Sequence, residues 1–328
     1  MMHALAQTLA AKQQQQTIEW SVAVFGYNEA AFLRRCLAAL AVAGRGRVMD
    51  VTVLLNGTTD ASPAIAMEGL RAAGLQGRVY LIPHADKSNA INQFLHVVRP
   101  PAETYVFVDA YAAVAPDALA LLALALKEAP CANGAAAVPS TGRSAARLRH
   151  DMQRYGGLHG SLFALRGQFV DRLAEQGLRL PLGMYRGDGL IGSLVFHDLD
   201  ALGGKWQRER VVVEPRATWT GPTLRPWRWR DARRLWRRLL QQGRGRLQWL
   251  AVRAAIYDGT LPPPAAGFAA LPPLADQRVL EWLAQEPKGR TPRWWKDPFA
   301  ALALRQMRQA PPPPDNSSLT AYLLMETA

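Results

Sequence analysis

The sequence has only two cysteines, Cys36 and Cys131, and their spacing is not that of a metal-binding motif. This scarcity excludes a disulfide framework and a zinc module, and it fits a reducing compartment. No stretch reaches the roughly 20 apolar residues that a membrane-spanning helix needs. The most apolar segment, residues 112–126, is short and contains a proline and an aspartate. Residues 1–20 lack the apolar core of a signal peptide, so we expect a cytoplasmic protein, either soluble or peripheral at the inner face of the membrane.

The motifs of three common enzyme classes are also missing. The sequence contains no Gly-x-x-x-x-Gly-Lys-Ser/Thr, Gly-x-Ser-x-Gly or His-Glu-x-x-His pattern, which counts against P-loop enzymes, nucleophile-elbow hydrolases and zinc proteases. Acidic residues are scarce, since 26 Asp and Glu stand against 39 Lys and Arg, for a net charge of +13. A field of this sign favours phosphorylated ligands, anionic lipid or nucleic acid as partners.

The first half of the sequence alternates regularly between strand and helix patterns. Four short apolar runs each lead into a polar turn, and the first three turns lead into segments with helical apolar spacing. The predicted strands are 20–26, 51–55, 79–82 and 105–108, and the predicted helices are 30–42, 62–73 and 88–98. This alternation predicts an α/β fold with a mainly parallel sheet that helices cover on both faces.

The composition divides the chain into three parts. We expect an N-terminal extension at residues 1–19, the α/β domain at 20–222 and a basic, Trp- and Pro-rich helical region at 223–328. In the last part, proline runs separate short helical pieces. With 328 residues, of which 49% are hydrophobic, the chain is long enough for one large domain and an appendage.

Polar residues gather where the predicted strands end. In chain order they are Tyr27-Asn28-Glu29, then Asn56 and Asp60, then Lys87 with Asn92, and finally Asp109-Ala110-Tyr111. Ligands of open α/β sheets bind beyond the carboxyl ends of the strands, where loops and helix N-termini converge. We therefore expect these residues to share one ligand site.

In their order and spacing, these loops resemble the landmarks of family 2 glycosyltransferases, which have a GT-A fold. The resemblance covers about residues 20–220 and implies a nucleotide diphosphate sugar as donor. The donor-binding residues that it implies are Tyr27, Asn28, Glu29, Asn56, Asp60, Lys87, Asp109 and Tyr111. It also implies Mg²⁺ or Mn²⁺ at Asp109, because these cations take carboxylate and phosphate oxygens as ligands.

The sequence departs from the family pattern at three acids. Tyr111 replaces the second acid of the Asp-x-Asp motif, Asn56 replaces an acid that reads the nucleotide base, and Gly187 replaces the acid before the catalytic base. A tyrosine hydroxyl, with a pKa of about 10, is a weak metal ligand at neutral pH, which leaves metal dependence open. Asparagine can both donate and accept hydrogen bonds, so contact with the base is retained.

Asp188 is the best match to the acid that deprotonates the acceptor hydroxyl in inverting members of the family. The alternative is a solvated loop aspartate. His159 lies in a glycine-rich stretch before Arg166, and it is either a functional residue or a solvated loop histidine.

The Arg/Trp segment, residues 227–249, allows three interpretations. A basic helix with Trp and Leu on one side could lie on an anionic membrane surface, where a lipid-linked acceptor would be found. The same helix could instead pack its apolar side on the core and expose its arginines. Nucleic acid is the third and least favoured partner, because no recognition fold accompanies the segment.

The resemblance implies an inverting glycosyltransferase of the hexosyltransferase type. Its acceptor would be a hydroxyl of a saccharide, of a lipid-linked molecule or of another compound. The alternative, motivated by the three missing acids, is a GT-A-like protein that has lost catalysis and serves in binding or assembly. A sugar nucleotidyltransferase is disfavoured because the glycine-rich phosphate loop after the first strand is absent.

Overall fold

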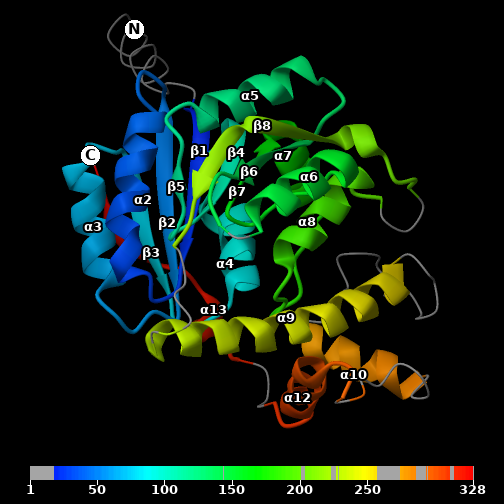
Figure 1. The fold of residues 1–328 in the computed structure, drawn as a ribbon. Coiled ribbons are helices and arrows are strands. Elements are labelled where there is room, and N and C mark those ends of the chain that lie inside the picture. The colour runs from blue at the N-terminus through cyan, green and yellow to red at the C-terminus, as the bar shows by residue number, and fades with distance from the viewer. Residues whose placement is uncertain are drawn as a thin grey trace, which may run out of the picture.

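The computed structural model describes residues 18–142, 144–200, 204–222, 227, 229–256, 274–285, 293, 295–310 and 314–327. Within these residues the chain forms one nine-stranded sheet in the order β5-β8-β6-β7-β4-β1-β2-β3-β9. The central parallel strands are β1 (Ile18–Gly26), β2 (Met49–Asn56), β3 (Gly77–Ile82) and β4 (Ala102–Asp109). The predicted α/β fold with helices on both faces is confirmed (Figure 1).

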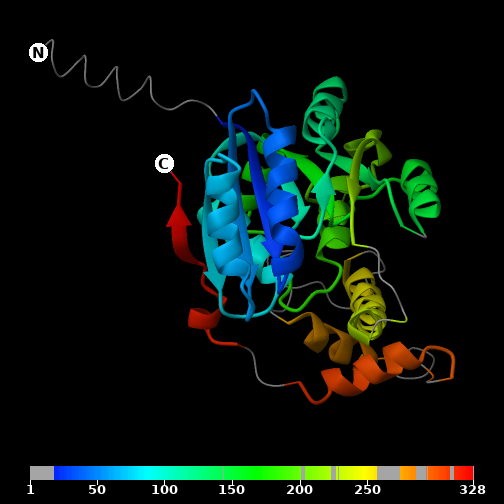
Figure 2. The ribbon, with the colours of Figure 1, turned by 60° about the vertical axis from the view of Figure 1, so that its left-hand side comes forward.

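The remaining strands extend the sheet on both sides. Strand β7 lies antiparallel between β4 and β6, β8 runs parallel to β6, and β9 closes the far edge by pairing antiparallel with β3. These strands are β5 (Ala113–Val114), β6 (Gly134–Pro139), β7 (Leu162–Arg166), β8 (Val211–Thr220) and β9 (Tyr322–Glu326). Figure 2 shows β9 beside β3, although nearly the whole chain separates the two strands in sequence.

Two apolar cores flank the sheet. On one face lie α2 (Ala30–Ala43), α3 (Ser62–Ala72) and α5 (Ala118–Glu128). The other core receives the short α4 (Lys87–Gln93), then α7 (Gly167–Glu175) and α8 (Gly187–Phe196). Helix α2 shows why the local sequence forms these elements, since Leu33, Cys36, Leu37 and Leu40 repeat at helical spacing and are all buried.

The third predicted helix, 88–98, ends at Val98 as expected, but its last turn is π-helical. Helix α4 ends at Gln93 and continues as a π-helical turn over Phe94–Val98, in which Arg99 N donates to the Phe94 carbonyl at 3.0 Å. The helix stops there because a residue before proline is disfavoured in the helical region, and Arg99 precedes Pro100. Phe94, the first residue of the π-helical turn, packs edge-on against Phe25 of β1 and Phe107 of β4, with 6.4 and 5.7 Å between ring centroids. This packing holds α4 over the ends of β1 and β4.

The C-terminal region contains helices, as predicted, and its long helix α9 (Trp229–Ile256) crosses the carboxyl-end side of the sheet (Figure 1). Its last residues depart from the prediction of a helical appendage, because they form β9 and join the central sheet. Helix α9 packs against α10 (Ala275–Gln285) and α12 (Pro298–Met307). The other helices are α6 (Ala145–Tyr155), the short 3₁₀ turn Arg208–Arg210 and α13 (Asn316–Leu319). Most of the predicted extension 1–19 and of the proline runs lies outside the described residues. No helix in the described part of the chain is long and apolar enough to cross a bilayer.

Candidate functional site

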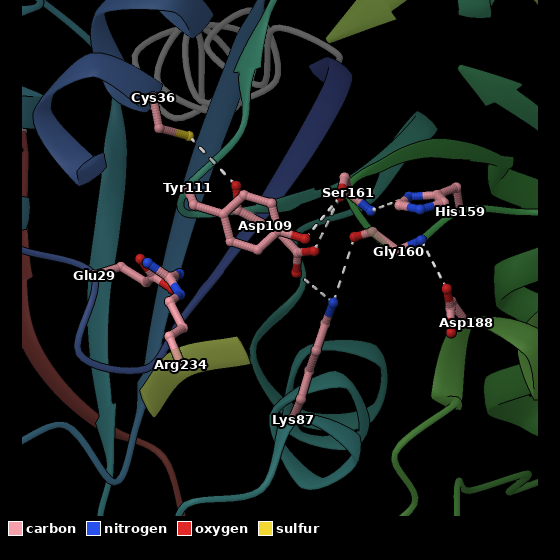
Figure 3. Close-up of polar contacts among 10 residues, drawn as sticks. All are labelled: Glu29, Cys36, Lys87, Asp109, Tyr111, His159, Gly160, Ser161, Asp188 and Arg234. Atoms are coloured by element: carbon pink, nitrogen blue, oxygen red, sulfur yellow. Dashed lines mark hydrogen bonds and ion pairs between the residues drawn. The ribbon is translucent and has the colours of Figure 1, made fainter. Parts of the chain in front are cut away.

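An ion pair between Lys87 and Asp109 forms the centre of the candidate site (Figure 3). Asp109 is the last residue of β4 and Lys87 the first of α4, so the parallel topology brings them together. Lys87 Nζ donates to Asp109 Oδ1 and to the Gly160 carbonyl, the latter at 3.4 Å. Burial acts to lower the pKa of Lys87, but the negative charges of Asp109 and Asp188 outweigh it and raise the pKa. Lys87 is therefore a stable ammonium ion.

The loop at residues 159–161 connects the two predicted carboxylates. Gly160 N donates to Asp188 Oδ2 at 2.8 Å, and Ser161 Oγ donates to Asp109 Oδ2 at 3.4 Å. A Cβ atom on Gly160 would lie 3.1 Å from Asp188 Oδ2 and 3.3 Å from Lys87 Nζ. The absence of a side chain at Gly160 thus lets the carboxylate and the ammonium group approach the loop from two sides.

Tyr111 lies against the same loop, with its hydroxyl 2.9 Å from Ser161 Oγ. Burial raises the pKa of Tyr111 well above 10.0, and the charge of Asp109 raises it further. The phenol is therefore neutral at physiological pH and offers a hydroxyl where the family has a carboxylate.

These residues do not fit a divalent cation held by protein carboxylates. One oxygen of Asp109 faces an ammonium ion and the other accepts from Ser161. A cation placed at the Lys87-bound oxygen would meet like charge. The described residues contain no group of three His, Cys, Asp or Glu side chains that could hold a metal ion.

The first two predicted loops are tied to each other. Asn28, in the left-handed region at φ 53°, accepts from Thr59 N at 2.8 Å and from Asp60 N at 3.3 Å through its Oδ1. Asp60 in return accepts from Ala30 N at 3.2 Å and from Ser62 N at 2.9 Å. Burial opposes the ionised form of Asp60, but these donors outweigh it and lower the pKa of its carboxyl. Asn28 and Asp60 therefore fix the shape of this edge of the site.

Asn56 is buried between the strand ends. In the orientation that gives both the nitrogen and the oxygen of its side-chain amide a hydrogen-bond partner, the nitrogen donates to the Gly26 carbonyl at 3.0 Å and the oxygen accepts from Asp86 N at 3.2 Å. Asn92 makes a similar link, since its amide donates to Leu180 O at 2.9 Å and accepts from Leu180 N at 2.8 Å. Both asparagines thus have backbone partners that hold loops in place.

Tyr27 and Glu29 lie at the mouth of the site. The Tyr27 side chain is exposed, with 49% of its surface accessible. Glu29 Oε1 accepts from Arg234 of α9 at 2.9 Å, while Glu29 Oε2 is buried and has no hydrogen-bond partner among the described residues. Burial raises the pKa of Glu29, against the lowering effect of Arg234.

Helix α9 crosses the mouth, and among the described residues it is hydrogen-bonded to the loops of the site at two places. Arg234 reaches Glu29 at one point, and Gln248 at the other accepts from Tyr185 N and donates to Gly183 O, both at 2.9 Å. Gly245 approaches closely, because a Cβ atom there would lie 2.8 Å from Tyr185 Cδ1. Local sequence patterns do not predict these contacts, because they join segments more than sixty residues apart.

His159 is part of the site rather than a solvated loop residue. Its ring lies 5.0 Å from the Trp219 ring between centroids, and its Nδ1 accepts from Ser161 N at 3.2 Å. Burial lowers the pKa of His159, against the raising effect of Asp188 and Asp109. The neutral imidazole thus helps to hold the loop that carries Gly160 and Ser161.

The predicted residues fall into two groups around the carboxyl ends of β1 to β4. Lys87, Asp109, Tyr111 and Asp188 meet at the 159–161 loop. The second group consists of Tyr27, Asn28, Glu29 and Asp60 in the first two loops, and Asn56 is buried behind them. Ser161 was not predicted, because a single serine carries no signal of its own before the antiparallel strand places it beside β4.

Comparisons with known proteins identify the family of the α/β domain and agree with its fold. The family described as "Glycosyl transferase family 2" matches residues 21–181. No curated protein sequence matches the chain. Among solved structures, a mannosyltransferase from Pyrobaculum calidifontis, in complex with GDP-Man and Mn²⁺, matches with a TM-score of 0.54 at 18% identity, covering 90% of this chain and 77% of that one.

A second solved structure is glucosyl-3-phosphoglycerate synthase from Mycobacterium tuberculosis, in complex with Mn²⁺, UDP and glucosyl-3-phosphoglycerate. It matches with a TM-score of 0.51 at 19% identity, covering 75% of this chain and 82% of that one. At these identities the likeness shows the fold, and the family match shows the relationship. Residues 21–181 therefore form a glycosyltransferase family 2 domain, and the chain has a GT-A fold.

Proposed function

We propose that the protein transfers a sugar, with inversion, from a nucleotide diphosphate sugar to an acceptor hydroxyl. The observation that carries this proposal is the 159–161 loop, which joins the Asp188 carboxylate to the Lys87–Asp109 pair at the carboxyl edge of the sheet. A base and a cationic site for a leaving group are thus held at the same edge of the sheet. Inverting transfer needs both, on opposite faces of the sugar.

In this mechanism, Asp188 takes the proton of the acceptor hydroxyl as that oxygen attacks the anomeric carbon. The bond from the anomeric carbon to the diphosphate oxygen breaks, and its electron pair leaves with the nucleoside diphosphate. Lys87, held by Asp109, stabilises the developing negative charge. One Asp188 oxygen accepts from Gly160 N, which orients the carboxylate and leaves its other oxygen to receive the proton.

The nucleoside would lie over the first two loops. Tyr27 is exposed and offers a face for the base, and Glu29 would lie beside the ribose in the same loop. Asn56 would affect recognition of the base indirectly, by fixing the loops to which it is hydrogen-bonded. The solved relatives contain GDP-Man in one case and UDP in the other, so hexose donors of both nucleotides are the first to test. Mg²⁺ or Mn²⁺ at Asp109 would have to displace Lys87 from the carboxylate.

Asp188→Asn tests the assignment of the base. We expect the release of UDP or GDP from UDP-glucose, UDP-GlcNAc and GDP-mannose, with water as acceptor, to slow by about 10²–10⁴-fold in kcat. Donor affinity should stay unchanged, because the amide keeps the contact with Gly160. Asp117→Asn, at an exposed position before α5, is the matched control. Wild-type turnover in Asp188→Asn would show that another group is the base.

A catalytically inactive binding or assembly protein is the second candidate, favoured by Asn56, Tyr111 and Gly187 in place of acids. Thermal shift against a panel of nucleotide sugars separates the two, because a ligand that binds only the native state stabilises it in proportion to RT ln(1 + [L]/Kd). A concentration-dependent shift with one donor, followed by its turnover, supports the transferase. No shift with any donor, with or without Mn²⁺, supports the binding protein.

The acceptor side of the proposal includes an anionic membrane surface. Trp229 and Trp236 are 81% and 54% exposed on a helix rich in arginine, and Trp227, just before this helix, is 76% exposed. Exposed tryptophan beside arginine is suited to the interface of an anionic bilayer. A lipid-linked acceptor would then be presented next to α9, at the mouth of the site.

A further inference from the structure

The charge of the leaving diphosphate must be balanced by positive groups near Asp109. Of the two carboxylates that meet at the 159–161 loop, Asp109 is paired with Lys87 and Asp188 accepts from Gly160 N. The position of a second acid is filled by the neutral hydroxyl of Tyr111, which is bonded to Ser161. The chain's own cations are therefore the groups to consider.

Lys87 is held so that it can serve a ligand. An ammonium ion has three N–H donors, and two of them have partners among the described residues, the Asp109 carboxylate and the Gly160 carbonyl. The ammonium also lies 5.9 Å from the centre of the Phe25 ring. Its side chain is nevertheless 40% exposed. The third donor is thus available to an anion in the site.

Helix α9 brings a second cation over the same place. Arg234 is fixed on Glu29, and Gly245 is packed on Tyr185 at the other side of the mouth. Arg238 follows Arg234 by about one turn, or about 6 Å along the axis, on the same face of the helix. It therefore lies between the two contacts of α9 with the core, above the carboxyl ends of the strands.

The electrostatics agree with this position. Arg238 is exposed, and within the described part of the chain it has no ion-pair partner. Burial is the main influence on the pKa of Tyr185 and raises it, while the charge of Arg238 lowers it. The same charge acts on the pKa of His159, where burial is again the larger effect. Arg238 thus faces the residues around Asp188 and Asp109.

We propose that Lys87 and Arg238 form a fixed cationic cradle that binds the diphosphate of the donor without a divalent metal ion. The cradle rests on the proposed function, because it assigns the charges that receive that reaction's leaving group. Lys87 contacts the diphosphate from α4 and Arg238 from α9. Asp109 is then a positioning residue that holds Lys87, and a guanidinium is well suited to bind phosphate oxygens in pairs.

Isothermal titration with UDP and GDP, in EDTA and in Mn²⁺, tests the cradle. We expect the protein to bind at least one of the two nucleotides in EDTA, with a Kd that Mn²⁺ changes by less than about threefold. Arg238→Met should weaken that binding about tenfold, which corresponds to about 1.4 kcal/mol. Because Arg238 is exposed, this variant is expected to keep the wild-type melting temperature.

Arg233→Met is the matched control. Arg233 is also exposed on α9, five residues earlier, and is rotated by about 140° around the helix axis from Arg238. The Arg233→Met variant should bind UDP and GDP with the affinity of wild type. Lys87→Met should weaken binding at least as much as Arg238→Met, and Lys87→Arg should restore part of it. Circular dichroism checks that both Lys87 variants are folded.

The outcomes separate this proposal from the proposed function. Binding that requires Mn²⁺, or equal effects of Arg238→Met and Arg233→Met, would overturn the cradle and leave the transferase intact. Binding of neither nucleotide, with or without Mn²⁺, would overturn the proposed function itself. Binding in EDTA that depends on Lys87 and Arg238 supports both.

Discussion

At the scale of single residues, Gly160 sets the distance between the charges of the site. Its backbone N–H holds Asp188 and its carbonyl accepts from Lys87. A base and a leaving-group cation must lie on opposite faces of one sugar ring, so their separation is part of the catalytic geometry. The residue that determines this separation carries no functional group of its own. It acts because it is small.

Gly160→Ala should therefore impair turnover more than folding. The added Cβ would lie 3.1 Å from Asp188 Oδ2 and 3.3 Å from Lys87 Nζ, so both side chains must move by a few tenths of an ångström. We expect kcat to fall by about tenfold, with a melting temperature close to that of wild type. Gly192→Ala on α8 is the control, because its Cβ would meet nothing closer than 3.7 Å. A large loss of stability in Gly160→Ala would mean that the glycine is needed for the fold.

At the scale of elements, the sequence predicted what adjacent residues determine. The strands β1 to β4 and their helices follow from local apolar spacing, and the polar residues at the strand ends follow each strand directly. The contacts that complete the site join distant segments. Ser161 reaches Asp109 only because β7 pairs with β4, and Arg234 reaches Glu29 across 205 positions. No local pattern encodes such contacts, which depend on packing of the whole domain.

Helix α4 illustrates how one element positions a catalytic charge. Its N-cap, Asp86, accepts from Ser88 N at 2.8 Å and from Gly183 N at 2.7 Å, and so ties the helix to the loop before α8. The cap thereby fixes Lys87, the next residue, relative to Asp188. Burial raises the pKa of Asp86 above 3.8, although these donors oppose the shift.

This shift predicts a pH dependence of stability. A carboxyl whose folded-state pKa is raised adds stability that is complete below its unfolded pKa and is lost as pH rises through the folded value. The asparagine of Asp86→Asn does not ionise, so this position contributes no pH dependence to the stability of the variant. The free energy of unfolding of wild type, relative to that of Asp86→Asn, should therefore decrease from acidic to neutral pH. Urea denaturation of both proteins across this range measures the difference. A difference that stays constant or rises with pH would contradict the prediction.

At the scale of the whole molecule, the net charge is +13, and the arginines of helix α9 concentrate part of this charge at the mouth of the site. Helix α9 carries arginines on the face toward the site and also on other faces. Trp229 and Trp236 are seven residues apart, which places them on one face of the helix, roughly opposite Arg234. One helix can thus contribute to the donor site on one side and present aromatic side chains to a surface on the other. The donor site would then have a fixed orientation relative to the surface that the tryptophans contact.

This orientation predicts binding to anionic vesicles. We expect the protein to sediment with phosphatidylglycerol vesicles and not with phosphatidylcholine vesicles, and the binding to weaken as salt screens the charges. Replacing Trp227, Trp229 and Trp236 with alanine should weaken it by roughly tenfold. The control is Tyr155→Ala on α6, an exposed aromatic residue whose ring lies 5.2 Å from the Arg154 guanidinium. Because Trp229 and Trp236 lie away from the site-facing side of α9 and Trp227 precedes the helix, the triple variant should keep its affinity for UDP and GDP. Equal vesicle binding by the triple variant and wild type would show that α9 does not contact the bilayer through this face.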